Sequence, residues 1–410
     1  MTENGIKVLM MGGRRAGKSS MLAGLFDVML GCDISKLVQV KDISQASNVS
    51  LSDKVKELKD TLQRKCGRVI LADTGATDKF QPYSLQFTIP RTEHSMTITF
   101  TDANGEYYAH SATYAREREE LKCRVKDSDI ILIAIDTVYL MEANEGQNDM
   151  ANCVESVQAL LTELEMEDKA KLVVYAPIKC ERWSRDGYSL DDVTRKVEKV
   201  YATSITALSA SPLVEILILP VQTVGNIVFK EQLPAYIYIE EGRPLRCSVI
   251  GDNDRLRFED GTIKEVYELQ TQNVVEDPTA LFQGTSIERP NTWFRVTGTQ
   301  YKPCNCEQLA YHILRYMLNR AIDAEKAKPK KKIEKKGMSP WIKWGLALAA
   351  LASGLGWLYA VAAASFVFDD KMGEVSFKEM EDLVNRLTSQ GYIKDSGDGI
   401  KIVQHYQKLS

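Results

Sequence analysis

The stretch Gly12-Gly-Arg-Arg-Ala-Gly-Lys-Ser19 fits the pattern G-x-x-x-x-G-K-[S/T] and directly follows the short apolar run Ile6–Met11. That run has the length and composition of a buried parallel strand, and Ser19–Leu30 has the pattern of a helix. In a strand–loop–helix unit of this kind, the glycines let backbone N–H groups surround phosphate oxygens, and the lysine adds a positive charge. The sequence therefore predicts a phosphate-binding loop that opens an α/β domain.

Further apolar runs of strand length follow this unit, and helical stretches separate most of them. The strand candidates are Ser84–Ile89, Met96–Thr101, Ile130–Ile135, Leu172–Ala176 and Ile216–Val221, and the helical stretches include Ala112–Lys126 and Ala151–Leu164. The polar connection Pro90–Ser95 is short, so the first two of these strands are predicted to form an antiparallel hairpin. The expected fold is α/β with a mixed, mostly parallel sheet.

Two long segments interrupt this alternation. The first, about residues 31–72, is longer than a usual connection and contains a predicted helix near Ser52–Lys65, so we interpret it as an effector arm. The second, Pro234–Asn291, alternates short runs with turn signals and predicts a β-rich insertion. The core is then expected at 1–233 and again at 292–322, through Trp293–Val296 and the helix Glu307–Leu318.

Composition excludes several classes of protein. With 410 residues, 44% of them hydrophobic, the chain can bury a sizeable core. The formal net charge of −4 and the pI near 5.8 argue against a general nucleic-acid binder. Eight scattered cysteines and four histidines show no disulfide or metal-ligand spacing, and the N-terminus does not look like a signal peptide. We expect reduced thiols and a domain that stays in the cytosol.

Residues beyond the glycine-rich loop complete a phosphate and magnesium site. Lys18 supplies charge to the β and γ oxygens, and Ser19 offers a hydroxyl to Mg²⁺. Asp102-Ala-Asn-Gly105 ends a predicted strand, where the carboxylate can hold a magnesium-bound water and the glycine amide can reach the γ-phosphate. Thr77 is the predicted additional magnesium ligand, with Thr74 as its rival and an ordinary polar loop as the alternative.

The order of these segments resembles the P-loop GTPases of the translation-factor and Ras-like class over about Ile6–Gly225. The resemblance implies that a strand leads to Asn/Thr-Lys-x-Asp, whose acidic residue reads guanine. Here Ile178-Lys179-Cys-Glu181 stands in that position, so Lys179 is expected to stack on the base and Glu181 to accept its hydrogen bonds, while Ile178 departs from the pattern. Thr223 lies in the loop expected to close over the base.

The resemblance also proposes catalytic residues. Small GTPases place a glutamine after the D-x-x-G pattern to orient water, and this chain has Glu106 there. Arg14 and Arg15 either stabilise transition-state charge or are simply solvated loop arginines. The predicted catalytic residues are Glu106, Arg14 and Lys18; the predicted magnesium ligands are Ser19, Thr77 and Asp102; the predicted nucleotide contacts are Gly12, Gly13, Arg14, Arg15, Ala16, Gly17, Lys18, Ser19, Ser20, Gly105, Lys179, Glu181 and Thr223.

The long arm, the Asp102-x-x-Gly-Glu run and Tyr301-Lys-Pro-Cys-Asn-Cys-Glu before the last core helix together resemble the GTPases of bacterial conflict systems, including the double-GTPase group. This resemblance implies a membrane-anchored, Mg²⁺-dependent GTPase that switches a protein partner or a second copy of itself, in a response to phage. The alternatives are a nucleotide-binding scaffold with little turnover and a P-loop ATPase.

The C-terminal part of the sequence predicts a membrane anchor. A basic linker, 323–340, precedes 341–368, in which Trp344–Phe368 carries no charge and is long enough to cross a bilayer once as a helix. Lysines before it and Asp369-Asp370 after it place the P-loop domain in the cytoplasm. The resemblance to conflict-system GTPases implies that the membrane is the inner membrane of a bacterium. The tail, 369–410, is expected to form a small helix-hairpin module on the far side.

Overall fold

A computed structural model of the chain describes most of the P-loop domain and parts of the remainder. The described residues are 5–14, 16–31, 34, 36–44, 53, 55–56, 58–59, 68–70, 80–90, 95–108, 114–142, 145–164, 170–183, 189–225, 227–232, 235–240, 243–250, 255–258, 262–265, 274–276, 292–296, 300–327 and 377–405.

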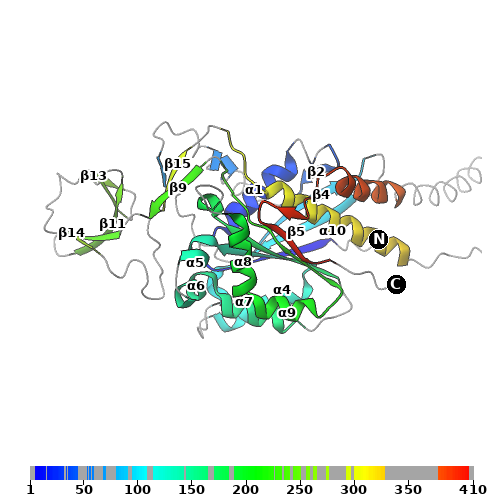
Figure 1. The fold of residues 1–410 in the computed structure, drawn as a ribbon, viewed down its shortest axis with the longest axis horizontal. Coiled ribbons are helices and arrows are strands. Elements are labelled where there is room, and N and C mark those ends of the chain that lie inside the picture. Colours follow the sequence, from blue (N-terminus) through cyan, green and yellow to red (C-terminus); the bar gives the residue numbers. More distant parts are fainter. Residues whose placement is uncertain are drawn as a thin grey trace, which may run out of the picture.

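A nine-stranded sheet forms the centre of the molecule, in the order β16-β17-β8-β7-β6-β1-β5-β4-β2 (Figure 1). The five strands from β8 to β5 are parallel, and antiparallel strands complete both edges. The strands are β1 (Ile6–Met11), β2 (Gln39–Asp42), β4 (Gln81–Thr88), β5 (Ser95–Asp102), β6 (Ile130–Asp136), β7 (Lys171–Ile178), β8 (Val214–Ile218), β16 (Ser396–Gly397) and β17 (Ile400–Gln404). The mixed, mostly parallel sheet and the β4–β5 hairpin are confirmed.

Helices cover both faces of this sheet, so the core has three layers. One apolar cluster joins α1 (Lys18–Leu30), α10 (Cys306–Ala327) and helix 377–389 to one face. A second cluster joins the other face to four helices, which are α4 (Ala115–Asp127), α7 (Val154–Thr162), α8 (Leu190–Val200) and α9 (Ala202–Ser209). Because β6 and β7 are covered on both sides, all their residues are buried, as expected for central parallel strands.

The connection after β6 differs from the single helix predicted at Ala151–Leu164. It contains α5 (Thr137–Glu142) and α6 (Glu145–Asn152), and α7 starts only after Cys153. Cys153 has a φ angle of 53°, in the left-handed region, and this conformation interrupts the helical path between α6 and α7. The C-terminal end of α6 lies against the P-loop, since a side-chain carbon at Gly13 would lie 1.9 Å from the Ala151 carbonyl oxygen.

The predicted β-rich insertion contains a five-stranded antiparallel sheet, in the order β13-β12-β11-β10-β14. Its strands are β10 (Ala235–Glu240), β11 (Arg243–Ile250), β12 (Arg255–Phe258), β13 (Ile263–Glu265) and β14 (Val274–Glu276). A separate three-stranded sheet pairs β9 (Ile227–Gln232) and β3 (Arg68–Ile70) with β15 (Thr292–Val296). The sequence analysis expected both Trp293–Val296 and the helix Glu307–Leu318 to return to the core. For Trp293–Val296 this was wrong, because it forms β15 of this separate sheet. The helix does return, as α10, and packs in the core.

The C-terminal tail is part of the P-loop domain. β17 pairs antiparallel with β8, and Met380, Leu383 and Leu387 of helix 377–389 are buried in the apolar cluster shared with α10. The expectation that the tail lies across a membrane from the P-loop domain was therefore wrong. The predicted spanning segment, 341–368, and most of the basic linker lie outside the described residues. Of the helices that are described, none is long and apolar enough to cross a bilayer.

A buried ion pair ties α10 to the sheet near the tail. Arg315 donates to the Glu215 carboxylate and contacts His312 Nδ1 at 3.3 Å. The side chain of Arg315 is 10% exposed and that of Glu215 is 7% exposed. Burial raises the pKa of Glu215, while the Arg315 charge opposes that rise. Burial also lowers the pKa of His312 to about 3, so this ring is neutral at physiological pH.

Replacing Arg315 with methionine is expected to destabilise the folded chain by about 3–5 kcal/mol, because it leaves the Glu215 carboxylate buried without its cation. The measurement is the midpoint of urea unfolding at pH 7.5. The double variant Glu215→Leu with Arg315→Met is the matched control, and it should recover most of the loss because no charge stays buried. Equal midpoints for wild type and Arg315→Met would contradict this prediction.

Candidate functional site

The glycine-rich loop lies between β1 and α1, at the edge of the sheet where the parallel strands end. Gly17 has a φ angle of 100° and lies directly before α1, a conformation that favours glycine. A side-chain carbon at Gly17 would lie 2.8 Å from Ile178 Cδ1. Ile178 thus packs on the loop by apolar contact where the resembling GTPases have a polar side chain.

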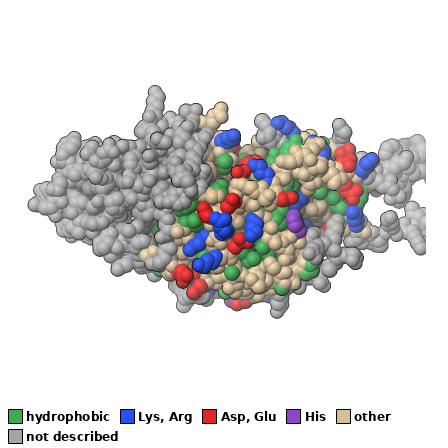
Figure 2. All heavy atoms as spheres, viewed as in Figure 1, with side chains coloured by type: hydrophobic (Ala, Val, Ile, Leu, Met, Phe, Trp, Pro, Cys, Tyr) green, Lys and Arg blue, Asp and Glu red, His purple; other side chains and the backbone are tan. Residues whose placement is uncertain are grey.

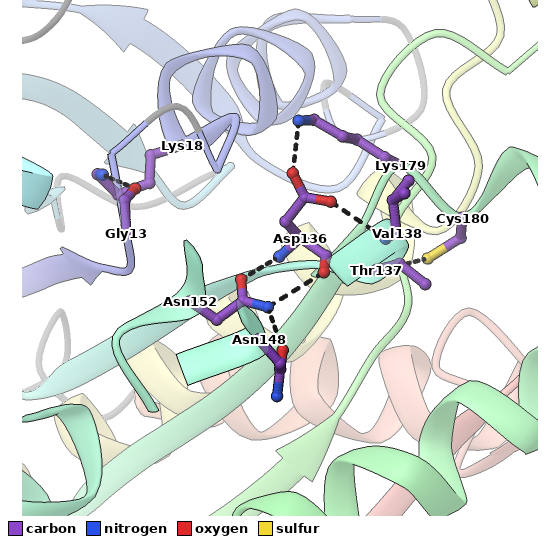
Figure 3. Close-up of polar contacts among 9 residues, drawn as sticks. All are labelled: Gly13, Lys18, Asp136, Thr137, Val138, Asn148, Asn152, Lys179 and Cys180. Carbon is purple, nitrogen blue, oxygen red and sulfur yellow. Dashed lines mark hydrogen bonds and ion pairs between the residues drawn. The ribbon is translucent and has the colours of Figure 1, made fainter. Parts of the chain in front are cut away.

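Lys18 points back over this loop. Its Nζ donates to the carbonyl oxygens of Gly12 and Gly13, at 3.0 Å each, and the residue is 7% exposed (Figure 3). A buried lysine is costly unless its charge has partners. The carbonyl contacts hold the ammonium group at the loop, where it is available to phosphate oxygens.

A hydroxyl and a carboxylate meet beside the first turn of α1. Ser19 Oγ donates to Asp102 Oδ2 at 2.9 Å, and Asp102, at the end of β5, is 1% exposed. Both are hard oxygen ligands of the kind that Mg²⁺ takes, usually one or two from protein and the rest from phosphates and water. Within the described part of the chain no group of three or more His, Cys, Asp and Glu side chains could hold a metal ion. The pair fits a magnesium ion that is shared with a nucleotide.

The segment after Asp102 lies directly on the loop. A side-chain carbon at Gly105 would lie 2.1 Å from the Arg14 backbone nitrogen, so only glycine fits there. The next residue, Glu106, binds Arg14 Nη1 through Oε1 at 2.6 Å and accepts from Tyr114 Oη through Oε2 at 2.7 Å. The hydrogen bond to Glu106 raises the pKa of Tyr114. Arg14 and Glu106 were predicted separately, and the structure joins them.

The base side of the site contains an acidic residue that the sequence analysis missed. Lys179 Nζ lies 2.7 Å from Asp136 Oδ2, and the Asp136 backbone N–H and C=O both bind the Asn152 side chain (Figure 3). Asn152 ends α6, which the break at Cys153 brings to this position. The sequence did contain a signal for Asp136, which directly follows the apolar run Ile130–Ile135. Polar residues at the carboxyl ends of parallel strands often line ligand sites.

Glu181 lies in the 3₁₀ turn Cys180–Arg182, which follows β7 and Lys179. It is 2% exposed, and burial raises its pKa from the ordinary 4.5 to about 7. The Lys179 charge opposes this rise, and the Asp136 charge adds to it. A buried carboxyl group whose pKa is raised toward neutral, beside other candidate site residues, is a functional candidate.

The loop that follows β8 reaches the same edge. Val221 bridges to Ile178, and its N–H donates to the Pro177 carbonyl at 2.7 Å. The Gln222 and Cys304 backbones exchange two hydrogen bonds, at 3.0 and 2.9 Å. Thr223 is 7% exposed in this loop. The loop is therefore held beside the Lys179 segment from both sides.

Comparison with known proteins gives a family match and similar solved structures. Residues 7–208 match the family model described as Double-GTPase 2. The chain carries a P-loop GTPase domain of the double-GTPase group. A solved structure similar to the chain is the S. cerevisiae Ski7 GTPase-like domain bound to GTP, with 13% identity, a TM-score of 0.32 and coverage of 71% of this chain and 75% of that one. No curated protein matches the chain.

The double-GTPase domain brings most of the predicted residues to one edge of its sheet. Arg15, Thr77 and its rival Thr74 lie outside the described residues, so their roles stay predictions. The predicted site residues that the structure does describe are Gly12, Gly13, Arg14, Ala16, Gly17, Lys18, Ser19, Ser20, Asp102, Gly105, Glu106, Lys179, Glu181 and Thr223.

Proposed function

We propose that the double-GTPase domain binds GTP together with Mg²⁺ and hydrolyses it. The observation that carries the proposal is the convergence of Lys18, Ser19, Asp102, Lys179 and Glu181 at the ends of β1, β5 and β7. Ligands of open α/β sheets bind at the carboxyl ends of the strands. These five side chains offer one cation for phosphates, two oxygens for a metal, and a cation and a carboxylate for a base.

In this proposal different residues bind the phosphates, the metal ion and the base of the nucleotide. Lys18 and the loop amides hold the phosphates, and Ser19 with Asp102 holds Mg²⁺, which neutralises charge on the β and γ oxygens when bound. Lys179 lies along the loop, since a side-chain carbon at Gly17 would be 3.8 Å from Lys179 Cε. The aliphatic part of the Lys179 side chain can therefore cover one face of the base. Glu181 then accepts hydrogen bonds from guanine N1 and N2, which adenine does not offer in the same pattern.

Hydrolysis requires a water molecule in line with the γ-phosphate. Glu106 follows Gly105, whose backbone touches the P-loop at Arg14, so its carboxylate stands at the phosphate end of the site. Arg14 and Tyr114 bind its two oxygens and hold its orientation. In this role Glu106 orients the water, and Arg14 contributes positive charge beside the transferred phosphoryl group.

Replacing Glu106 with alanine is expected to lower kcat for GTP hydrolysis about a hundredfold, while the Kd for GTP changes less than about threefold, because the residue orients water and binds no ground-state group. The measurement is phosphate release from GTP and Mg²⁺ by the full chain. Glu119→Ala, an exposed change on α4, is the control and should keep wild-type turnover. An unchanged kcat in Glu106→Ala would rule out this role.

A second candidate function is a nucleotide-binding scaffold with little turnover. The engagement of both Glu106 oxygens by Arg14 and Tyr114 favours it, because a carboxylate held by two donors has less capacity to accept from water. Wild-type chain that binds GTP with Mg²⁺ but releases no phosphate would establish this candidate. Equal competition by ATP would instead favour a P-loop ATPase.

The proposal extends to the location and use of this activity. The apolar run Trp344–Phe368 attaches the chain to the cytoplasmic face of a bacterial inner membrane, and the nucleotide state switches a protein partner or a second copy. The resemblance to conflict-system GTPases supports a role in antiphage defence. Plating efficiency of phage on cells that carry wild type or Lys18→Ala tests that role, and equal plating on both and on empty cells would exclude it.

One face of the described domain carries side chains of both charges. On the face drawn in Figure 2, Lys and Arg side chains are intermixed with Asp and Glu side chains. α8, for example, carries Asp191, Asp192 and Glu198 beside Arg195 and Lys196. A nucleic-acid site needs a basic patch or stripe, and the described residues of this face do not form one.

A further inference from the structure

The C-terminal tail is fixed to the double-GTPase domain by backbone pairing. β17 lies next to β8 in the same sheet as the P-loop strand β1, with Lys401 opposite Ile218 and Ile402 opposite Leu217. Helix 377–389 covers the face of this sheet that α1 and α10 also cover, and it buries Met380 and Leu387 completely. The tail therefore completes the core, and it is not a separate module.

Side-chain contacts reinforce this position at several points. Gln308 of α10 donates to the Tyr392 carbonyl at 3.0 Å and accepts from the Lys394 N–H at 2.9 Å. Gln404 of β17 donates to the Ser211 and Val214 carbonyls, at 2.6 and 2.8 Å. These bonds satisfy buried backbone groups of the tail and of the β8 region, so separating the two parts would leave those groups without partners.

The two ends of the chain that flank residues 328–376 lie side by side. α10 ends at Ala327, and Lys326 Nζ lies 3.1 Å from Glu381 Oε1 and 5.2 Å from the centre of the Phe377 ring. Figure 1 shows α10 and the C-terminal helix next to one another at one end of the molecule. The chain thus leaves the domain and returns to it at nearly the same point.

We propose that the P-loop domain and the tail lie on the same side of the membrane. The proposal rests on the membrane attachment proposed above. A single helical crossing would put about 30 Å of hydrocarbon between α10 and helix 377–389, and paired strands cannot be separated by that distance. The end of the molecule that contains Lys326 and Phe377 then faces the lipid surface.

Protease protection tests the side on which the tail lies. Inverted inner-membrane vesicles, from cells that produce the full chain with one epitope tag before Met1 and another after Ser410, expose their cytoplasmic face to added protease. We expect loss of both tags at the same protease concentration, without detergent. A C-terminal tag that survives until detergent is added would overturn the proposal. Absence of the chain from the vesicles would instead overturn the membrane attachment on which it rests.

A zero-length cross-link gives a second readout in the same vesicles. A carbodiimide joins a lysine amine to a carboxylate only where the two are in contact, and Lys326 and Glu381 are. We expect mass spectrometry to find the Lys326–Glu381 peptide from membrane-bound chain, and to lose it in Glu381→Gln. Membrane-bound wild type that lacks both this peptide and the Lys401–Glu198 peptide, while the Lys59–Asp27 pair of the P-loop domain still cross-links, would show that the tail is separated from the domain at the membrane and would overturn the proposal.

Discussion

Replacing Lys18 with alanine is expected to weaken GTP binding at least about a hundredfold. The ammonium group already lies at the loop, held by the Gly12 and Gly13 carbonyls at 3.0 Å, and it offers a charge-assisted bond to the phosphates without having to move far. Truncating one partner of a buried charge pair costs about 3 kcal/mol or more, and 1.4 kcal/mol corresponds to a factor of ten in Kd. The measurement is a calorimetric titration of the full chain with GTP in Mg²⁺.

The control for this prediction is Lys199→Ala, which removes an exposed lysine from α8 and should leave the Kd unchanged. Both variants should unfold at the urea concentration of the wild type or above it, because Lys18 is buried and contributes little to stability without a ligand. A Kd for Lys18→Ala within about threefold of wild type, in a folded protein, would show that the loop does not bind the nucleotide phosphates.

The sequence predicted the parts of the site that are encoded by neighbouring residues. The P-loop, its strand and its helix are contiguous, so the glycine spacing and the apolar run were sufficient to locate them. Asp102-x-x-Gly105 was found for the same reason, because it directly follows a strong strand pattern. Local patterns of this kind depend on backbone geometry within a few residues, and tertiary contacts do not alter them.

Contacts between distant residues could not be predicted in the same way. Lys179 and Asp136 meet because β6 and β7 are adjacent in the sheet, and Arg14 meets Glu106 because β1 and β5 are adjacent. The order of the strands in a sheet cannot be predicted from the residues of any one strand. The position of β17 was missed for a further reason, since the hydropathy of Trp344–Phe368 indicates a bilayer and does not reveal that the two flanking segments pack together.

Lowering the pH from 7 to 6 is expected to reduce the preference for GTP over ATP about fivefold. Burial raises the pKa of Glu181 to about 7, and only the ionised carboxylate can accept from both guanine N1 and N2. With a pKa of about 7, roughly one-half of the Glu181 side chains are ionised at pH 7 and roughly one-eleventh at pH 6, so the affinity for guanine falls by that ratio. Above about pH 8 nearly all of the side chains are ionised and the preference becomes constant.

The ratio of the two dissociation constants is the quantity to measure, from pH 5.5 to 8.5. GTP and ATP carry the same triphosphate, so its own titration and any change at Lys18 cancel in the ratio. Glu181→Gln should give a low ratio that does not vary with pH, and the exposed change Glu119→Gln should follow wild type. A wild-type ratio that stays constant across this range would contradict the assignment. Because the pKa of Glu181 is higher in the folded chain than in the unfolded one, the stability of the ligand-free fold falls as the pH rises from about 4.5 to 7 and stays lower above that range. Glu181→Gln should therefore be more stable than wild type at about pH 8. A residue that lowers the stability of the fold but increases discrimination between bases serves ligand recognition, and it does not serve to stabilise the fold.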